Sequence, residues 1–439
     1  MFVGTELLDD SVTYSWLINL LSTVVSLGVI SFIVGRKRHL TNIKWLGYTL
    51  PVGLCVGSLL LVLFPLSEAR LAIAFVIAFA LGPIEALFWI LWGEHFARNK
   101  GRFSMTSVGA MFGATLLTTI SITLLLPGHL ASIFTSILPL VSGYLYLRDA
   151  KNNTKGFPPL LPRKASRGAL KSIVIVCGIS FVASIACYFL AAIIPWDALP
   201  TRDVSFTLGV MCGAVMLLVI AAVCHLSKNT INAFKMLPWL LVVIVVAFTF
   251  GIADEALYFP SFLLSVAISS IFEIMLIMYF GILTSKGYIA PAIAFALSAG
   301  SIRIGIGLGN TLALVYEHNP AFAHAWTPET CLAFMCILVV LLIPLVRQEY
   351  VIAEMTTTPR TASELDTICD EVTSEFKLSA REGEILHLLA YGHTADSIAK
   401  KLVISPYTVN THIRHIYEKM QIHKRTELLN YINMRRSDA

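Results

Sequence analysis

Residues 377–429 read KLSAREGEILHLLAYGHTADSIAKKLVISPYTVNTHIRHIYEKMQIHKRTELL, and this stretch decides the fold of the C-terminal part of the chain. Ser379 and Glu382 form an S-x-x-E capping box, which opens a first helix. Thr394 and Ser405 are residues of the type that cap the start of a second and a third helix. A fourth helix follows, so the stretch predicts four short helices in a helix-turn-helix arrangement.

The third helix is the one that a helix-turn-helix inserts into the major groove of DNA. Val409, Ile413 and Ile416 lie on its apolar side, so its polar side faces outward. Asn and Arg side chains make paired hydrogen bonds to adenine and guanine, and a Thr methyl group can contact thymine. The residues predicted to contact the bases or phosphates of DNA are Thr394, Ser405, Tyr407, Thr408, Asn410, Thr411, Arg414, Lys419, Lys424 and Arg425.

This stretch resembles the LuxR/GerE-type helix-turn-helix. The resemblance is carried by Leu378, Arg381, Glu382, Glu384, Leu388, Leu389, Ala390, Gly392, Ile398, Ala399, Leu402, Ser405, Thr408, Val409, His412, Ile413, Tyr417, Lys419, Ile422, Arg425 and Glu427. It implies bacterial transcription control, binding to double-stranded promoter DNA and a homodimer formed through the fourth helix. It also implies base contacts at Asn410, Thr411 and Arg414. The family often has Lys where Asn410 stands, which predicts a different base preference here.

The chain ahead of this stretch is too apolar for a soluble protein. Of the 439 residues, 56% are hydrophobic and 13% are charged, and the mean hydropathy is +0.77. A soluble domain averages about 25% charged residues, and a helix that crosses a bilayer needs about 20 mostly apolar residues. The eleven predicted spans are 14–34, 45–65, 71–92, 105–126, 130–147, 173–194, 205–226, 237–253, 261–283, 289–316 and 328–346.

These patterns predict an all-α protein in three parts. Residues 1–346 form a polytopic bundle of about eleven transmembrane helices, in which Thr327 and Pro328 signal the start of the last span. Residues 347–376 form a cytoplasmic linker, whose first residues continue the last helix. Residues 377–439 form the DNA-binding domain.

Basic residues in the loops predict the orientation of the bundle. Alternate loops on one side hold 17 Lys and Arg residues, whereas the opposite loops hold only Arg70 and Arg202. The basic side is therefore predicted to face the cytoplasm. With eleven spans in a bacterial cytoplasmic membrane, the N-terminus lies outside and the DNA-binding domain inside, where DNA is.

The long basic loop at 148–172 divides the spans into five and six. This division resembles a major-facilitator-type transporter that lacks the first helix. The loop at 93–104 weakly resembles that family's loop motif of glycine and basic residues, although the spacing of these residues differs. The principal hypothesis is a one-component regulator whose membrane domain senses a small molecule or an envelope signal. A solute transporter with a fused regulatory head is the alternative, and a membrane anchor without a sensing role is a third.

Ionisable residues inside predicted spans are costly and therefore mark candidate functional sites. Glu85, Glu273 and Arg303 lie within spans, and Asp254 and Glu255 lie near the outer boundary. Arg303 paired with Glu273 or Glu85 predicts a site for a polar or charged ligand. A structural ion pair that locks the bundle remains an equal alternative.

Other chemistry has little support in the sequence. We find no nucleophile elbow, phosphate-binding loop, kinase signature or metal-ligand cluster in the sequence, so we expect no enzyme activity and no cofactor. The eight cysteines include no C-x-x-C pair and are interpreted as small apolar residues. His412 is expected to pack inside the domain, because no second ligand stands at metal-binding spacing in the sequence.

Overall fold

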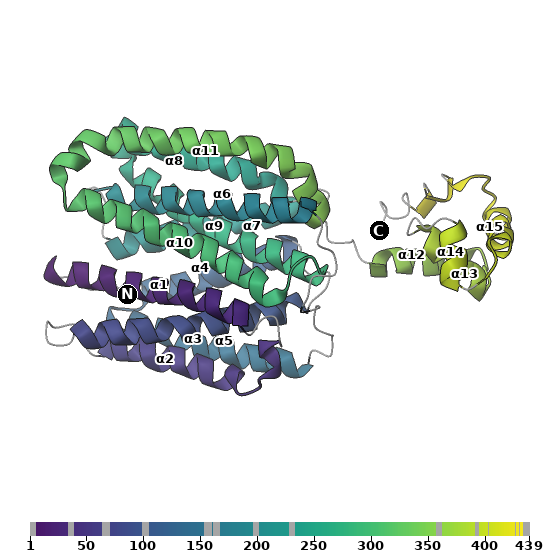
Figure 1. Cartoon of the computed structure of the whole chain (residues 1–439), viewed down its shortest axis with the longest axis horizontal. Coiled ribbons are helices and arrows are strands. Elements are labelled where there is room, and N and C mark those ends of the chain that lie inside the picture. The colour runs from purple at the N-terminus through teal and green to yellow at the C-terminus, as the bar shows by residue number, and fades with distance from the viewer. Residues whose placement is uncertain are drawn as a thin grey trace. The chain divides into compact units, whose positions relative to one another are not determined.

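The computed structural model divides into two compact units, Met1–Thr356 and Thr357–Ala439, and each is described by itself (Figure 1). The described residues are 6–33, 39–63, 71–98, 105–152, 160, 167–195, 202–227, 233–356, 362–390, 395–402, 404–425, 427–429 and 431–432. Within these residues the regular structure is entirely helical, as predicted.

The first unit, which we call the membrane unit, is a bundle of long apolar helices. They are α1 (Glu6–Ile33), α2 (Leu46–Leu63), α3 (Leu71–Ala97), α4 (Ala110–Leu125), α5 (His129–Asn152), α6 (Arg167–Ile193), α7 (Arg202–Leu226), α8 (Leu237–Ala253), α9 (Tyr258–Ser285), α10 (Pro291–Glu317) and α11 (Pro320–Thr356). Among the described residues, ten helices are long and apolar enough to cross a membrane.

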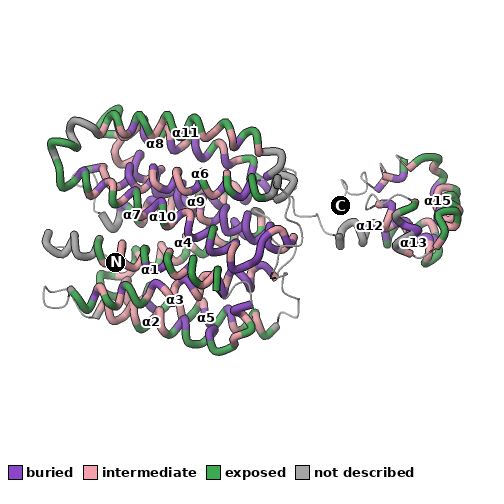
Figure 2. Tube along the Cα trace, in the orientation of Figure 1, coloured by how far each residue is buried: buried purple, intermediate pink, exposed green. Residues whose placement is uncertain are grey.

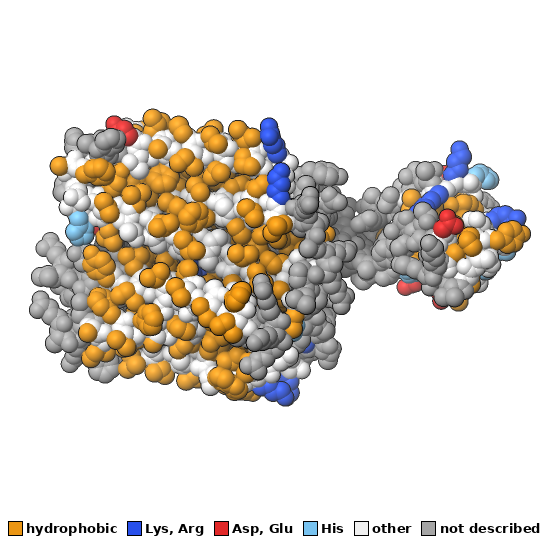
Figure 3. All heavy atoms as spheres, viewed as in Figure 1, with side chains coloured by type: hydrophobic (Ala, Val, Ile, Leu, Met, Phe, Trp, Pro, Cys, Tyr) orange, Lys and Arg blue, Asp and Glu red, His pale blue; other side chains and the backbone are white. Residues whose placement is uncertain are grey.

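The outer surface of the membrane unit is apolar. Large hydrophobic side chains such as Phe32, Val76 and Trp239 are exposed on its helices, and Figure 3 shows hydrophobic side chains over most of the described part of the visible face. In water such a surface would be unfavourable, because each exposed apolar Å² costs about 25 cal/mol. Lipid would remove this cost, so the apolar surface and the ten apolar helices are those expected of a multi-pass membrane protein.

Two predicted spans differ from the helices of the structure. The segment at 45–65 forms α2, whose 18 residues extend about 27 Å. It is apolar but shorter than the ten other spans, and its length is at the lower end of the range that can cross a bilayer. The last helix begins at Pro320 and contains Pro328 in its interior. The apolar span Thr327–Gln348 agrees with the predicted span 328–346. Only the predicted helix start at Thr327 and Pro328 is wrong, because a proline can be accommodated inside a membrane helix.

Helix α9 lies at the centre of the membrane unit. It packs against α3, α6, α7, α8, α10 and α11, and 89% of its most apolar window is buried (Figure 2). Every residue of α9 is buried or half-buried, so its side chains face neighbouring helices. A site inside the bundle is therefore expected to include residues of α9.

Close packing joins α10 to α6. Gly305 and Gly309 stand one helical turn apart on α10, and a methyl group at Gly305 would lie 2.5 Å from the Phe181 carbonyl oxygen. At Gly309 it would lie 2.6 Å from the Ile185 carbonyl oxygen. Glycine allows this approach because it has no side chain, and small residues four positions apart are common where membrane helices pack closely.

Replacement of Gly305 by alanine is therefore expected to destabilise the membrane unit by about 1–3 kcal/mol, the usual cost of overpacking. The measurement is the unfolding temperature of the purified full-length protein in detergent. Gly300→Ala on the same helix is the matched control, because a methyl group there would meet nothing within 4 Å. Equal unfolding temperatures for the two variants would contradict the packing argument.

The second unit, which we call the head, contains α12 (Ala362–Glu375), α13 (Ala380–Ala390), α14 (Ala395–Leu402) and α15 (Pro406–Met420). The described residues between 425 and 432 add helical turns that correspond to the predicted fourth helix. Their side chains share one core, in which Ile385, Val409, Ile416 and Leu428 are fully buried.

Helix α12 changes the predicted linker. The segment 347–376 is not one continuous connector, because α11 extends to Thr356 and α12 belongs to the head. Ile368, Cys369 and Val372 of α12 lie in the core of the head, and α12 packs against α13. Because polar residues dominate the sequence of α12 and its apolar stripe is narrow, the sequence alone predicts a linker in this segment.

Candidate functional site

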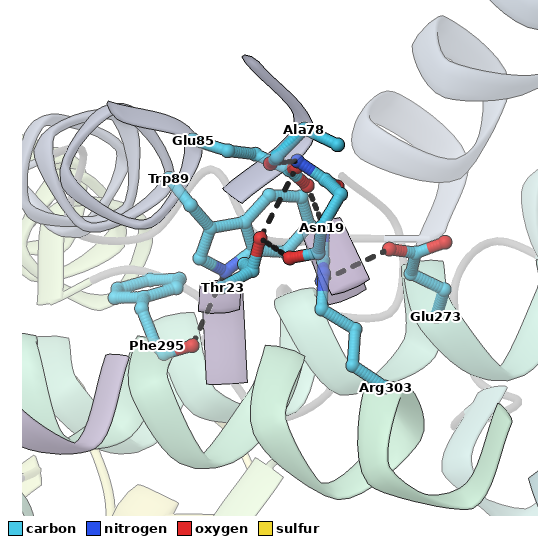
Figure 4. A network of polar contacts seen from close by, with 8 residues as sticks. All are labelled: Asn19, Thr23, Ala78, Glu85, Trp89, Glu273, Phe295 and Arg303. Carbon is cyan, nitrogen blue, oxygen red and sulfur yellow. Dashed lines mark hydrogen bonds and ion pairs between the residues drawn. The ribbon is translucent and has the colours of Figure 1, made fainter. Parts of the chain in front are cut away.

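Charged residues from three helices meet inside the membrane unit (Figure 4). The Arg303 guanidinium on α10 donates from Nη2 to Glu85 Oε1 on α3 at 2.9 Å. Its Nη1 lies 3.8 Å from Glu273 Oε1 on α9. Both pairings that the sequence suggested for Arg303 are therefore present at once, and we call these three residues the Arg303 cluster.

Neighbouring polar and aromatic groups hold this cluster in place. Thr23 on α1 donates to Glu85 Oε2 at 3.4 Å, and Asn19 donates to the Ala78 carbonyl oxygen at 3.1 Å. The Trp89 ring centroid lies 4.8 Å from Arg303 Cζ, which is a cation–π geometry. Trp89 Nε1 in turn donates to the Phe295 carbonyl oxygen at 3.2 Å. Arg303 is thus fixed by α1, α3, α9 and α10 together.

The two acidic residues near the outer boundary lie apart from this cluster. Asp254 is exposed and accepts a hydrogen bond from the Ala256 backbone N–H at 2.9 Å, so it caps the short helix η6 (Glu255–Leu257). Glu255 is also exposed and precedes the start of α9. Glu273 follows 15 residues after Tyr258, which is roughly 22 Å along the helix axis. The predicted outer mouth therefore does not share the Arg303 cluster.

A second group of buried ionisable residues escaped the sequence analysis. Glu94 has no exposed surface and accepts from the Thr41 backbone N–H at 3.1 Å. His39 Nδ1 lies 3.8 Å from Glu94, and the neighbouring His95 lies 2.5 Å from Asp149. The sequence analysis placed Glu94 and His95 in the loop at 93–104, but α3 continues to Ala97 and buries both. Sequence hydropathy alone contains no signal for this burial.

The capping pattern predicted for the head is confirmed. The Ser379 backbone N–H donates to Glu382 Oε2 at 2.7 Å, and the Glu382 backbone N–H donates to Ser379 Oγ at 3.3 Å. Ser405 caps α15 by accepting from the Thr408 backbone N–H at 3.0 Å. Thr394, the predicted cap of α14, lies outside the described residues. These caps fix where α13 and α15 begin, and hence which face of α15 is outward.

The outward face of α15 presents most of the predicted base contacts to solvent. Tyr407 is 83% exposed, and Asn410 and Arg414 are also exposed. Arg414 Nε lies 3.7 Å from Glu418 in a solvent-exposed pair. Thr411 is half-buried and donates to the Tyr407 carbonyl oxygen at 3.1 Å. Asn410 and Arg414 are therefore the side chains most available to base edges.

Three predicted phosphate contacts have different surroundings. Lys424 is exposed, whereas Arg425 Nη2 donates to the Leu389 carbonyl oxygen at 3.4 Å. Lys419 Nζ lies 2.7 Å from Glu382 Oε2 and 3.3 Å from the Lys377 carbonyl oxygen. Lys419 thus supports the head internally, which differs from its predicted contact with phosphate.

His412 also differs from its prediction. Ligand atoms of His412, His415 and Glu382 lie within 4.8 Å of one another, so the expectation that no second ligand stands near His412 is wrong. Glu382 lies 30 positions before His412 in the sequence, which hid its place in the grouping. Because Lys419 already neutralises Glu382, the arrangement serves the packing of α15 on α13.

Glu382 makes the stability of the head depend on pH. Hydrogen bonds from Lys419 and Ser379, which outweigh the opposing effect of its desolvation, lower the pKa of Glu382 to about 2. Since this pKa lies below the ordinary value, the pair stabilises the head above about pH 4.5. That contribution is lost as pH falls from there toward 2.

We expect Glu382→Gln to flatten this pH dependence, since Gln retains the capping hydrogen bond but not the charge. The measurement is hydrogen exchange of α13 and α15 in the full-length protein at several pH values between 2 and 7. Glu384→Gln is the control, because Glu384 forms an exposed pair with Arg381 and such pairs contribute about 0–1 kcal/mol. Equal acid sensitivity of wild type and Glu382→Gln would contradict the assignment.

Comparison with known proteins identifies the head. Residues 377–432 match the family described as bacterial regulatory proteins, luxR family. The chain is 44% identical over 48 residues to the probable transcriptional regulatory protein NarL of Mycobacterium tuberculosis, covering 11% of this chain and 22% of that protein. It is 46% identical over 66 residues to the oxygen regulatory protein NreC of Staphylococcus epidermidis, covering 14% and 30%.

A third relative is the uncharacterized response regulatory protein YgeK of Escherichia coli, 38% identical over 65 residues, covering 14% of this chain and 44% of that protein. The chain therefore spans less than half the length of each of these relatives. The head is a LuxR-type helix-turn-helix domain. The resemblance of the membrane unit to a major-facilitator transporter stays a prediction.

Proposed function

We propose, starting from the LuxR-type head at residues 377–432, that the protein is a membrane-embedded one-component transcriptional regulator of a bacterial cytoplasmic membrane. The observation that carries the proposal is the presence of this DNA-binding head in one chain with a multi-pass membrane unit. The membrane unit takes the position of a sensor, and the head reads promoter DNA.

DNA recognition uses the outward face of α15. Its capped N-terminal end enters the major groove, where Asn410 pairs with adenine and Arg414 with guanine. Tyr407 and Thr411 line the same face. The phosphates are contacted by Thr394, Ser405, Thr408, Lys424 and Arg425. Lys419 contacts a phosphate only where the exposed side of its side chain reaches the DNA backbone. The head dimerises through the helix that begins near Arg425, so one dimer reads two half-sites.

The membrane unit transmits a signal through the Arg303 cluster. The cluster joins α3 of the first five helices to α9 and α10 of the last six, so a change in its pairing alters how the two groups of helices pack. An effector shifts such an equilibrium only if it binds the two arrangements with different affinity. Loops rich in Lys and Arg place the head in the cytoplasm.

Chromosomal sites bound by the tagged full-length protein test the DNA-reading role. Wild type is expected to occupy discrete sites that disappear in the Asn410→Ala/Arg414→Ala variant, because each paired base contact contributes about 1–3 kcal/mol of discrimination. Glu371→Ala on α12 is the control, since Glu371 is exposed and lies off α15. Unchanged sites in the double variant would remove base reading by α15.

The sensing role is tested with a reporter for a promoter found in that map. Arg303→Ala is expected to abolish the response to growth conditions that change wild-type expression, while basal occupancy of the promoter stays. Removal of the guanidinium leaves Glu85 and Glu273 unpaired, which disrupts the two arrangements. If the variant is present in the membrane in the same amount as the wild type and still responds, the cluster has no sensing role.

A solute transporter with a regulatory head is the second candidate. The observation that favours it is a charged group inside the bundle beside a central helix, which is common along solute paths. This candidate predicts solute accumulation in vesicles that Glu273→Ala abolishes, whereas the regulator predicts none.

A further inference from the structure

The Arg303 cluster contains more negative than positive charge. Arg303 supplies one positive charge, and Glu85 and Glu273 supply two negative charges when ionised. Among the described residues, the groups that act electrostatically on Arg303 are Glu273, Glu85 and Tyr188. A tyrosine hydroxyl is neutral near pH 7, so the ionised cluster has a net charge of −1.

Glu85 is the carboxylate that the protein already satisfies. Its Oε1 accepts from Arg303 Nη2 at 2.9 Å, and its Oε2 accepts from Thr23 Oγ1 at 3.4 Å. Thr23 Oγ1 also donates to the Asn19 carbonyl oxygen at 2.9 Å, so the hydrogen bond from Arg303 is the stronger of the two contacts to Glu85. The pair Glu85–Arg303 therefore forms a fixed part of the site.

Glu273 is held much more loosely. Its Oε1 lies 3.8 Å from Arg303 Nη1, and that buried nitrogen has no hydrogen-bond partner in the described part of the chain. We also find no hydrogen bond to the Glu273 carboxylate from the described residues. The side chain of Glu273 is 39% exposed, close to the 35% of Glu85, although α9 is the most buried of the described spans. The two carboxylates therefore differ in their hydrogen bonds and not in their exposure. In Figure 4 it lies across from Glu85, on the other side of Arg303.

These observations describe a half-buried carboxyl group beside Arg303 that has no hydrogen-bond partner among the described residues. An anion is disfavoured there, because it would meet a net negative charge. Because Arg303 Nη1 lies 3.8 Å away and donates no hydrogen bond to it, the Glu273 carboxylate can accept a hydrogen bond from a cation. A bare metal ion requires several oxygen ligands, whereas an ammonium group can donate hydrogen bonds to one carboxylate.

We propose that Glu273 binds the ammonium group of a small organic amine, which completes the charge balance of the Arg303 cluster. The inference rests on the proposed sensing function and names the chemical class of its effector. The bound amine competes with Arg303 Nη1 for Glu273 and so loosens α10 from α9. Trp89 and the Glu85–Arg303 pair remain as the fixed wall of the site.

Three probes of similar size and different charge test this proposal on the purified full-length protein in nanodiscs, without DNA. Benzylammonium is expected to shift the thermal unfolding temperature, whereas benzyl alcohol and benzoate are not. Glu273→Gln is expected to weaken benzylammonium binding by about tenfold to a hundredfold, the effect of one charged hydrogen bond. Glu255→Gln, the same change in the exposed carboxylate that precedes α9, is the control and is expected to bind as wild type does.

Equal shifts of the wild-type unfolding temperature with benzyl alcohol or benzoate would overturn the proposal. This comparison needs no variant, so it holds even if Glu273→Gln folds poorly. Lowering the pH from 8 to 6 without an amine is the last comparison. If this alone shifts the unfolding temperature of the wild type but not of Glu273→Gln, the positive charge is a proton and the amine proposal is overturned. Failure here with intact promoter sites would leave the regulator in place. Missing promoter sites with intact amine binding would instead remove the regulator.

Discussion

A guanidinium inside a bilayer has to find its counter-charge within the protein, and the membrane unit is arranged around this constraint. Insertion scales give about 2.5–3.5 kcal/mol for one Arg at the centre of a membrane helix. Arg303 meets Glu85 and Glu273 from two other helices, and Thr23 brings in α1. The same charge that is costly in lipid therefore determines which helices must meet. It also leaves one carboxylate for a ligand.

Close backbone packing completes this arrangement. Gly305 and Gly309 bring α10 against the backbone of α6 within two turns of Arg303, so the position of the guanidinium is set by a rigid helix pair. Glu273 lies on α9, which almost all neighbouring helices contact. A change in the pairing of Arg303 therefore reaches several helices at once, because packed interiors do not deform smoothly. This is the physical basis for a bistable sensor in the proposed function.

The head obeys the same electrostatic rule on a smaller scale. Glu382 is buried. Its carboxylate pairs with Lys419 and accepts a hydrogen bond from the Ser379 backbone N–H. This contact attaches α15 to the start of α13. The outward face of α15 is then left to Tyr407, Asn410 and Arg414, which make no core contacts. A rigid inner face and a free outer face are what a recognition helix requires.

Local patterns in the sequence determined the helices, the capping box at Ser379 and Glu382, the cap at Ser405 and the exposed side of α15. Each of these depends on residues within about one helical turn, where spacing along the chain fixes spacing in space. Only the tertiary structure decided that Arg303 contacts both carboxylates, that Lys419 faces Glu382 rather than solvent alone, and that α12 belongs to the head. The burial of Glu94 was decided in the same way. Such pairings join residues distant in sequence, and they depend on how helices pack, which periodicity within a single helix does not encode.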